Sequence, residues 1–410
     1  MPRLSGIELF ELDLPFRHEF RHAAANRTRS SSLFVRFLTD GGACGYGEAL
    51  PRPYVTGEER GAAFDLLAER ILPRALRMSF ASFDEVLAFL ARCDGKAPAE
   101  WVDPRTPHTA AWTAVDLALL DAFGRAFGTE LQRGLPSGLA GPGPANEWPP
   151  GLRYSLVLSG EGGARAVLGL LKARAYGISD VKVKVDHQSS AGVRLARRML
   201  GRQARIRVDS NMDWTGAEAR AVMPELARLG VETFEQPLAA GDIEGMARLG
   251  AETGLAVIAD ESFDDAASLE RLIAARACAG VNVRIAKCGG LVAALARCRQ
   301  ALGAGLALHV GCLVGETSQL SAAQLVLVRT LGSRIEHVEG CYGERLLQVD
   351  PVRPLLQFRR GGRPPASPGG PGFGTRVDLD TLALYAGRRV ALGASIPSIA
   401  QPQERHEERP

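Results

Sequence analysis

The stretch VKVKV at residues 181–185 decides how this chain is expected to fold, because charged residues close four later apolar runs at almost the same spacing. Those residues are Asp209, Glu235, Asp260 and Lys287, and the intervals, counted from the second lysine of VKVKV, are 25 to 27 residues. An interval of that length accommodates a strand, a loop and a helix. The spacing therefore predicts a β/α barrel, in which charged residues at the carboxyl ends of the strands gather at one rim.

Eight short apolar runs are candidate strands of this barrel. Segments with helical periodicity separate them, such as Ala164 to Ala175, Ala191 to Leu200 and Leu291 to Leu302. Because a helical crossover joins each consecutive pair, we expect the strands to pair in parallel. The candidate strands are residues 153–157, 181–185, 205–209, 232–235, 256–260, 281–285, 306–310 and 334–338.

Three carboxylates, Asp209, Glu235 and Asp260, would meet at the rim and would repel one another unless a cation lay between them. Ligation by oxygen alone suits Mg²⁺, with Mn²⁺ as an alternative, rather than zinc. Lys184 and Lys287 would flank that metal from nearly opposite sides, since the second and sixth strands lie across the barrel from each other. This arrangement suits removal and return of a proton next to a carboxylate, through an enediolate that a metal stabilises.

The motifs at these strand ends carry a resemblance to a known family. A single lysine at a strand end is usually a solvated residue and a single aspartate is usually a helix cap, but five in this order favour a shared site. The matching motifs are KVK at 182–184, DSN at 209–211, EQP at 235–237, DES at 260–262 and KCGG at 287–290. Taken jointly, they resemble the enolase superfamily and, within it, the muconate lactonizing enzyme subgroup of the mandelate racemase/muconate lactonizing enzyme family.

The resemblance implies a role for each matching residue. The three carboxylates would bind Mg²⁺, and Lys184 and Lys287 would form the acid/base pair, each taking the proton from one stereoisomer in a racemase or epimerase. Lys182 would help to neutralise the substrate carboxylate. Asn211 and Glu339 are further candidate contacts to the substrate.

Other polar residues near the rim have two interpretations each. His309 could be a base, as in the mandelate racemase subgroup, but with Lys287 in the strand-six role we favour a packed histidine. Glu316 and Glu339 are rim carboxylates whose alternative is a helix cap or a surface charge. Dipeptide epimerases of the superfamily hold the substrate amino group with an Asp-x-Asp pair at the end of strand eight. Residues 337–340 read HVEG instead, so we do not expect that specificity.

Residues 1–133 are predicted to form an N-terminal capping domain. Strands are expected at Ile7 to Leu14 and at Leu33 to Leu38, with a third after the turn that follows. The resemblance implies two mobile loops over the mouth of the barrel, at Arg17 to Ser32 and at Pro51 to Glu58. Helices are expected at Glu59 to Arg77, Ser82 to Arg92 and Thr109 to Phe127.

The remaining segments complete the predicted organisation. Residues 134–150 are rich in Gly and Pro and are interpreted as a linker, followed by the barrel at 151–341. Residues 342–394 are expected to return to the cap, and 395–410 to form a disordered tail. The predicted fold class is α/β: a (β/α)7β TIM-like barrel with an N-terminal α+β capping domain that C-terminal segments complete.

The first presumed loop carries four arginines, Arg17, Arg21, Arg27 and Arg29. They are either a solvated basic surface or a means of attracting an anionic substrate. A second anionic or strongly polar group on the substrate would give this loop a partner. On that interpretation dicarboxylates or N-acylated amino acids are favoured over simple dipeptides, and Arg21 is the first candidate contact.

Composition excludes several other classes of protein. The 410 residues are 46% hydrophobic and 23% charged with a net charge of +3, which is ordinary for a globular protein and gives no reason to expect nucleic acid as a partner. No apolar run approaches the roughly 18 residues of a membrane helix, and the N-terminus lacks the pattern of a signal peptide. Seven cysteines without a C-x-x-C pair favour a reducing cytoplasm. We expect a homo-oligomer that acts on a small carboxylate.

Three functional hypotheses remain open at this point. The first is a Mg²⁺-dependent isomerase, either a racemase or epimerase or a cycloisomerase. The second is a dehydratase that eliminates water from a hydroxy acid through the same enediolate. The third, from another class, is a metal-binding barrel without activity, which is disfavoured because every expected ligand and both lysines are present.

Overall fold

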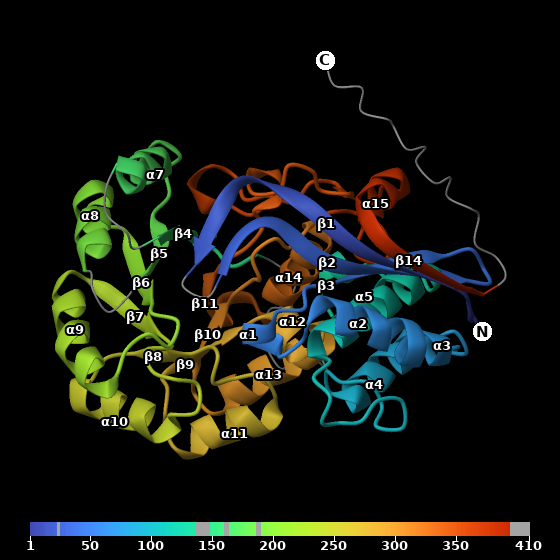
Figure 1. Ribbon diagram of the computed structural model, residues 1–410, viewed down its shortest axis with the longest axis horizontal. Helices are drawn as coiled ribbons and strands as arrows, with labels where there is room; N and C mark the ends of the chain where they lie inside the picture. The colour runs from blue at the N-terminus through green and yellow to red at the C-terminus, as the bar shows by residue number, and fades with distance from the viewer. Residues whose placement is uncertain (23–24, 136–147, 160–163, 186–189, 394–410) are drawn as a thin grey trace.

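The computed structural model describes residues 1–22, 25–135, 148–159, 164–185 and 190–393, which form a barrel and a cap that lies against it (Figure 1). Most of the predicted linker and the whole predicted tail, 395–410, lie outside the described residues. Within the described residues, no helix has the length and apolar character that a membrane crossing requires.

Eight parallel strands make up the barrel and follow one another in sequence order, as predicted. The ring closes where Tyr154 forms a parallel bridge with Val338 and the Ser155 amide donates to the Val338 carbonyl at 2.8 Å. The first strand starts later than predicted, at Leu156. The strands are β4 (Leu156–Ser159), β5 (Asp180–Lys184), β6 (Arg205–Asp209), β7 (Val231–Glu235), β8 (Val257–Ala259), β9 (Gly280–Val283), β10 (Ala307–Val310) and β11 (Ile335–Val338).

Helices that cover the outside of the barrel alternate with these strands (Figure 1). Thr215 and Glu218 form a capping box, in which each side chain bonds the other residue's backbone amide. The helices are α7 (Ala164–Ala175), α8 (Ala191–Leu200), α9 (Gly216–Arg228), α10 (Ile243–Thr253), α11 (Ala266–Ala274), α12 (Ile285–Cys288), α13 (Leu291–Gly303) and α14 (Ser318–Leu331).

An antiparallel sheet in the order β14-β1-β2-β3 and a group of helices form the cap. The long helix α5 packs on β3 so closely that a Cβ at Gly47 would lie 1.8 Å from the Ala114 carbonyl oxygen, so only glycine fits there. The cap elements are β1 (Leu4–His22), β2 (Ala25–Thr39), β3 (Cys44–Ala49), α1 (Pro53–Thr56), α2 (Arg60–Leu66), the π-helix η1 (Leu67–Ile71), α3 (Leu72–Ala75), α4 (Phe83–Cys93), α5 (Thr109–Ala126) and β14 (Ala386–Gly393).

The predicted mobile loop from Arg17 to Ser32 is instead a β-hairpin. Strands β1 and β2 continue through it and pair as far as His22 with Ala25, with one irregularity in register between Pro15 and Phe20. The segment contains neither Gly nor Pro, so nothing in it interrupts the two strands once they pair. The loop that the family resemblance implied for this segment is therefore replaced by paired strands. In Figure 1 this hairpin extends from the cap over the barrel.

The C-terminal part of the chain returns to the cap, as predicted. Strand β14 pairs antiparallel with β1 from Gly393 opposite Gly6 to Ala386 opposite Leu12. Leu347 and Leu382 belong to a small apolar core that also contains Phe10 and Leu14 of β1. The cap therefore has no complete sheet or core until the end of the chain has been placed.

A buried carboxylate ties three strands of this sheet together. Glu8 of β1 is 1% exposed, and one of its oxygens accepts a hydrogen bond from the Arg36 guanidinium of β2 at 2.6 Å. The other oxygen accepts from Arg389 of β14, whose Nε lies 3.1 Å away. Removing such a carboxylate leaves two partly buried arginines without their anion.

We therefore predict that Glu8→Ala lowers the free energy of unfolding by about 3 kcal/mol, as measured by urea denaturation. The control is Asp13→Ala on the same strand, because Asp13 pairs with Arg29 at 3.1 Å and both side chains are more than 40% exposed. That exposed pair should contribute less than about 1 kcal/mol. Equal losses in the two variants would contradict the prediction.

Candidate active site

The barrel brings five of the predicted site residues together at the carboxyl ends of β5 to β8. Parallel register places Lys184 beside Asp209 and Asp209 beside Glu235. Asp260 follows the last residue of β8 directly, and Lys182 lies two residues before the end of β5 on the same face as Lys184. The predicted convergence of three carboxylates with these two lysines is therefore present in the fold.

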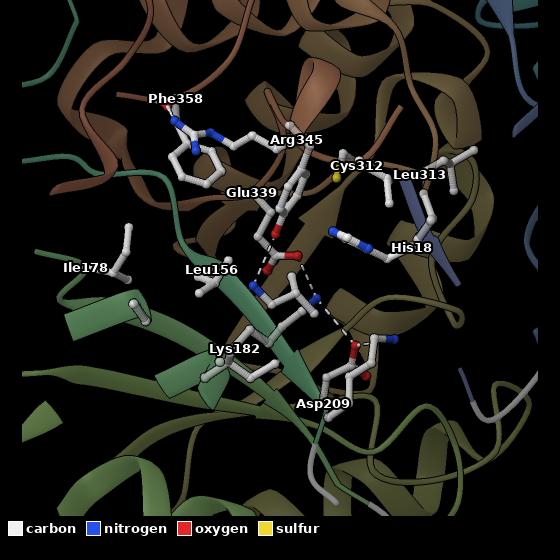
Figure 2. A pocket seen from close by; sticks show the side chains of 18 of the residues that line it. His18, Leu156, Ile178, Lys182, Asp209, Cys312, Leu313, Glu339, Arg345 and Phe358 are labelled. Atoms are coloured by element: carbon white, nitrogen blue, oxygen red, sulfur yellow. Dashed lines mark hydrogen bonds and ion pairs between the residues drawn. The ribbon is translucent and has the colours of Figure 1, made fainter. Parts of the chain in front are cut away.

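Lys182 is a buried cation between three carboxylates. Its Nζ lies 2.8 Å from Glu339, 3.0 Å from Glu235 and 3.3 Å from Asp209. Figure 2 shows Lys182, Asp209 and Glu339 in this arrangement. Burial by itself would lower the pKa of Lys182, but the three carboxylates, Glu235 first, hold it above its ordinary value. Lys182 therefore stays charged and neutralises protein carboxylates at the floor of the cavity.

Glu339 is held by a second buried cation that the sequence analysis missed. Arg207 of β6 donates to Glu339 at 3.0 Å and to the Ser155 hydroxyl at 2.6 Å, and the arginine is 1% exposed. A signal for it was available, because alternation in the run RIRVD puts Arg207 on the same face as Asp209. Glu339 lines the cavity, yet two protein cations already occupy its oxygens.

Lys184 differs from Lys182 in that its amine reaches the cavity. Its side chain is 19% exposed and its Nζ donates to Asn211 Oδ1 at 2.7 Å, with Asp209 at 3.6 Å. Burial lowers the pKa of the Lys184 amine below its ordinary value, against the opposing charge of Asp209. Asn211 also donates to Glu261 at 3.2 Å, and it is not among the described residues that line the cavity. Asn211 therefore contacts Lys184 and Glu261.

Asp260 is bound by two cations from the segment that follows β9. Lys287 Nζ lies 2.7 Å from one carboxylate oxygen, and Arg284 forms an ion pair with the other. Lys287 also donates to the backbone carbonyls of Asp260 and Asn282, at 2.6 and 3.1 Å. Burial, with Arg284 as the next cause, lowers the pKa of Lys287 to about 7.

The placement of Lys287 differs from the expectation that it flanks the metal on the cavity side. Strand β9 ends at Val283, and α12 begins at once at Ile285. The first charged residue after the strand is Arg284, which lines the cavity, while Lys287 is 1% exposed and packs over the Phe263 ring at 4.9 Å. Ile285 and Ala286 are apolar and resemble a continuation of the strand. The strand end was therefore expected at Lys287, which lies three residues after Arg284.

A cavity of about 500 Å³ lies above these groups, between the barrel, the cap and the C-terminal segment. Polar groups gather at its floor, and its wall is mostly apolar. Arg345 lies over the rings of Tyr176 and Phe358, 4.6 and 4.9 Å from their centres. The cap contributes His18 and Glu19 from the hairpin and Tyr54 and Val55 from the predicted second loop. The apolar wall includes Leu156, Ile178, Leu313 and Phe358 (Figure 2), together with Leu158 and Leu346.

The three carboxylates fit a hard divalent cation. Asp209 Oδ2 and Glu235 Oε2 are buried, yet neither accepts a hydrogen bond from any described residue. Asp260 has a cation on each oxygen, but a carboxylate oxygen keeps a second lone pair. An all-oxygen donor set of this kind suits Mg²⁺.

Comparison with known proteins agrees with the barrel fold. Residues 167–381, about half of the chain, match the family described as Enolase C-terminal domain-like. The chain belongs to this family. The predicted resemblance to the enolase superfamily is therefore confirmed, together with the barrel and capping-domain fold.

Curated relatives of this enolase-superfamily chain are similar along most of its length. An L-Ala-D/L-Glu epimerase from Clostridium acetobutylicum is 26% identical, over 81% of this chain and 89% of the relative. An N-succinyl-L-Arg/Lys racemase from Bacillus cereus is 26% identical, over 78% and 82%. A chloromuconate cycloisomerase from Cupriavidus pinatubonensis is 24% identical, over 92% and 96%.

Solved structures share the fold. The N-succinyl Arg/Lys racemase from Bacillus cereus has a TM-score of 0.81 at 23% identity, over 95% of this chain and all of that chain. A dipeptide epimerase from Cytophaga hutchinsonii, complexed with Mg and the dipeptide D-Ala-L-Val, has a TM-score of 0.78 at 20% identity, over 95% and 99%. Both extend across the cap as well as the barrel.

Three of the four cap arginines have described side chains, and two of these three already have partners on the protein. Arg17 bonds to the Glu344 carbonyl and Arg29 pairs with Asp13, so both already have partners on the protein surface. Arg27 lies 5.7 Å from the centre of the Tyr54 ring, which lines the cavity. The side chain of Arg21, the first candidate contact, lies outside the described residues.

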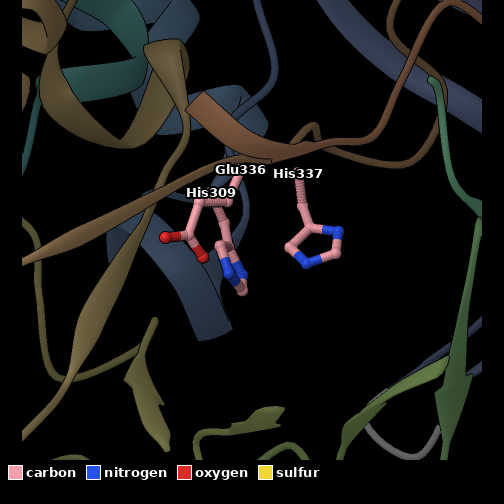
Figure 3. A group of neighbouring side chains, drawn as sticks. All are labelled: His309, Glu336 and His337. Atoms are coloured by element: carbon pink, nitrogen blue, oxygen red, sulfur yellow. The ribbon is translucent and has the colours of Figure 1, made fainter. Parts of the chain in front are cut away.

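A second group with metal-ligand chemistry lies on β10 and β11, with two buried histidines and one exposed glutamate. Ligand atoms of His309, Glu336 and His337 all lie within 4.8 Å of one another (Figure 3). His337 already uses both ring nitrogens, with Asp180 3.0 Å from Nδ1 and an Arg205 nitrogen 2.9 Å from Nε2. The guanidinium occupies the position that a metal would need, so this group fits a cation less well than the three carboxylates.

The surroundings of His337 also keep it neutral. Burial and then the charge of Arg207 lower the pKa of His337 to about 4, although Asp180 opposes them. Arg205, Glu232 and Glu336 are the other charged groups near the ring, and His309 packs against it with ring centres 4.7 Å apart. Unfolding exposes the ring, and its pKa returns to about 6.5.

We predict that this histidine makes the protein less stable as the pH falls from 6.5 to 4. The unfolded chain binds the proton first in this range, so the free energy of unfolding should fall by on the order of 3 kcal/mol. In His337→Gln that part of the loss should disappear in urea denaturation at pH 7, 5.5 and 4.5. Exposed His18, replaced by Gln, is the control and should keep the wild-type profile. Identical profiles for wild type and His337→Gln would refute the assignment.

Proposed function

We propose that this protein is a Mg²⁺-dependent isomerase that abstracts a proton α to a substrate carboxylate. The observation that carries the proposal is the amine of Lys184, which reaches the cavity beside Asp209, the carboxylate that lies next to Glu235 across the sheet. A proton-transfer group and a trio of carboxylates are the two parts that such a reaction needs.

Each residue of the floor contributes a distinct part of this chemistry. Asp209, Glu235 and Asp260 would hold Mg²⁺, whose positive charge would stabilise the negative charge that develops on the substrate carboxylate. Lys184 takes the proton from the α-carbon, and Asn211 fixes the direction of its amine through the 2.7 Å bond. Lys182 keeps the floor electrically balanced. The wall of the cavity excludes water from the carbanionic carbon.

The choice of isomerase over the other hypotheses follows from the relatives. An epimerase, a racemase and a cycloisomerase are similar to this chain over most of its length. Nothing in the relatives favours the dehydratase alternative. A barrel without activity is disfavoured because Lys184 is both buried enough to have a lowered pKa and open to the cavity.

The substrate that fits best has a carboxylate at one end and, next to it, a carbon chain that can lie along an apolar wall. The carboxylate would lie near the floor, and the rest of the molecule would follow the wall formed by Leu156, Ile178 and Phe358. N-acylated amino acids meet this description, as the sequence analysis expected. Arg17 and Arg29 already have protein partners, so we do not propose them as contacts to a second anionic group of the substrate.

We predict that Mg²⁺ raises the melting temperature of EDTA-treated protein. Binding to the folded state at one hundred times the dissociation constant contributes about 2.7 kcal/mol, a shift on the order of 5 °C for a chain of this size. Asp209→Asn should abolish the shift in differential scanning fluorimetry. Glu232→Gln, an exposed carboxylate at the start of β7, should retain it. A melting temperature that does not respond to Mg²⁺ would rule out the proposed site.

A second prediction concerns proton exchange. In D₂O with Mg²⁺, the enzyme should exchange the α-proton of at least one member of a panel made of N-succinyl-L-lysine, N-succinyl-D-lysine, L-Ala-L-Glu and L-Ala-D-Glu, followed by ¹H NMR. Lys184→Ala should slow that exchange by at least about 100-fold. Lys96→Ala, a surface lysine paired with Asp265, is the control and should change it less than threefold. Full exchange by Lys184→Ala would show that this lysine is structural.

A further inference from the structure

Two cationic side chains reach the cavity from opposite sides of the barrel, and they are chemically different. Lys184 ends β5 and Arg284 follows β9, and these strands are four places apart in a closed ring of eight. Both line the cavity. The three carboxylates of β6, β7 and β8 lie on the arc between them.

Arg284 is held in place but still has capacity for a ligand. It forms an ion pair with Asp260 and lies 3.8 Å from Glu235, which fixes its orientation. Its side chain is 11% exposed and lines the cavity. A guanidinium that reaches the cavity beside a carboxylate cluster is suited to bind an anionic oxygen.

Lys287 cannot take that position from where it lies. Three oxygens surround its Nζ: the Asp260 carboxylate, the Asp260 carbonyl and the Asn282 carbonyl, at 2.6 to 3.1 Å. An ammonium has three N–H bonds, so all of them are used. The amine therefore lies behind Asp260, away from the cavity, and acts on the site only through that carboxylate.

We propose that Arg284, and not a lysine, faces the substrate on the β9 side, so that proton transfer takes place on the Lys184 side alone. This inference rests on the proposed function and specifies from which side of the substrate the enzyme can take the proton. Guanidinium stays protonated in proteins and does not accept a proton. The enzyme then exchanges the α-proton of one stereoisomer and leaves its mirror image intact.

The proton and the electron pair can be followed through such a reaction. Lys184, as the neutral amine, takes the proton from the α-carbon, and the electron pair of the C–H bond moves into the carboxylate to give the enediolate. Arg284 keeps its protons and donates hydrogen bonds to the negative oxygen. The electron pair then returns to the α-carbon, which takes the proton back from Lys184 on the same face. Alternatively, the electron pair expels a group from the neighbouring carbon. Intramolecular addition and elimination, the work of a cycloisomerase, needs one proton-transfer face, whereas racemisation needs two.

The test measures exchange for each stereoisomer of N-succinyl-lysine separately, by ¹H NMR in D₂O with Mg²⁺. Wild type should exchange one stereoisomer at least 100-fold faster than the other. Arg284→Lys should raise exchange of the slow stereoisomer at least tenfold, because an amine then faces it. Lys287→Met should change both rates by a similar factor, since it acts through Asp260, and should leave the preference between stereoisomers as it was.

The alternative outcomes separate this inference from the proposed function. Comparable exchange of both stereoisomers by wild type, with one of them lost in Lys287→Met, would support the function and overturn the role of Arg284. If no member of the panel exchanges, the proposed function fails for these substrates. Whether Arg284 or Lys287 faces the cavity is then decided by trinitrobenzenesulfonate labelling and peptide mass mapping of the folded protein. Labelling of Lys184 and of the new amine in Arg284→Lys, with Lys287 unreactive, supports the inference, and labelling of Lys287 overturns it.

Discussion

The arrangement at the carboxyl end of the barrel depends on charge balance in a place that water hardly reaches. A single buried ion costs several kcal/mol, so each cation on this floor is held against an anion. Lys182 illustrates the constraint, because it contacts three carboxylates and is 2% exposed. The buried cations of this floor are Lys182, Arg207, Arg284 and Lys287, and its buried anions include Asp209, Glu235, Asp260 and Glu339.

This balance separates residues that stabilise the floor from residues that are available to a substrate. Arg207 and Lys287 form hydrogen bonds with protein oxygens and are not among the described residues that line the cavity. Lys184 and Arg284 each keep part of their side chain at the cavity. The distinction does not follow from residue type, since each group contains one lysine and one arginine. It follows from which side of the carboxylates the side chain occupies.

The cavity above the floor is a product of three distant parts of the chain. The β1–β2 hairpin brings His18, the short helix α1 brings Tyr54, and the C-terminal segment brings Arg345 and Phe358 to a site whose chemistry lies on the barrel. Pairing of β14 with β1 and the Glu8 ion cluster hold the cap sheet together. The shape of the substrate pocket is thus tied to the stability of the cap, while the proton-transfer chemistry is tied to the barrel.

The sequence by itself determined the barrel and most of its floor, because strand, loop and helix lengths fix a repeat of 25 to 27 residues and strand ends fix which side chains meet. Asp209, Glu235 and Lys184 could be assigned from that rule alone. The rule did not place Lys287 correctly. Ile285 and Ala286, which follow Arg284, are as compatible with the end of a strand as with the first turn of a helix. Only the tertiary structure decided that β9 stops at Val283 and that Arg284 faces the cavity. It also decided that the polar segment after Arg17 is a hairpin, since pairing between strands depends on the partner and not on the segment alone.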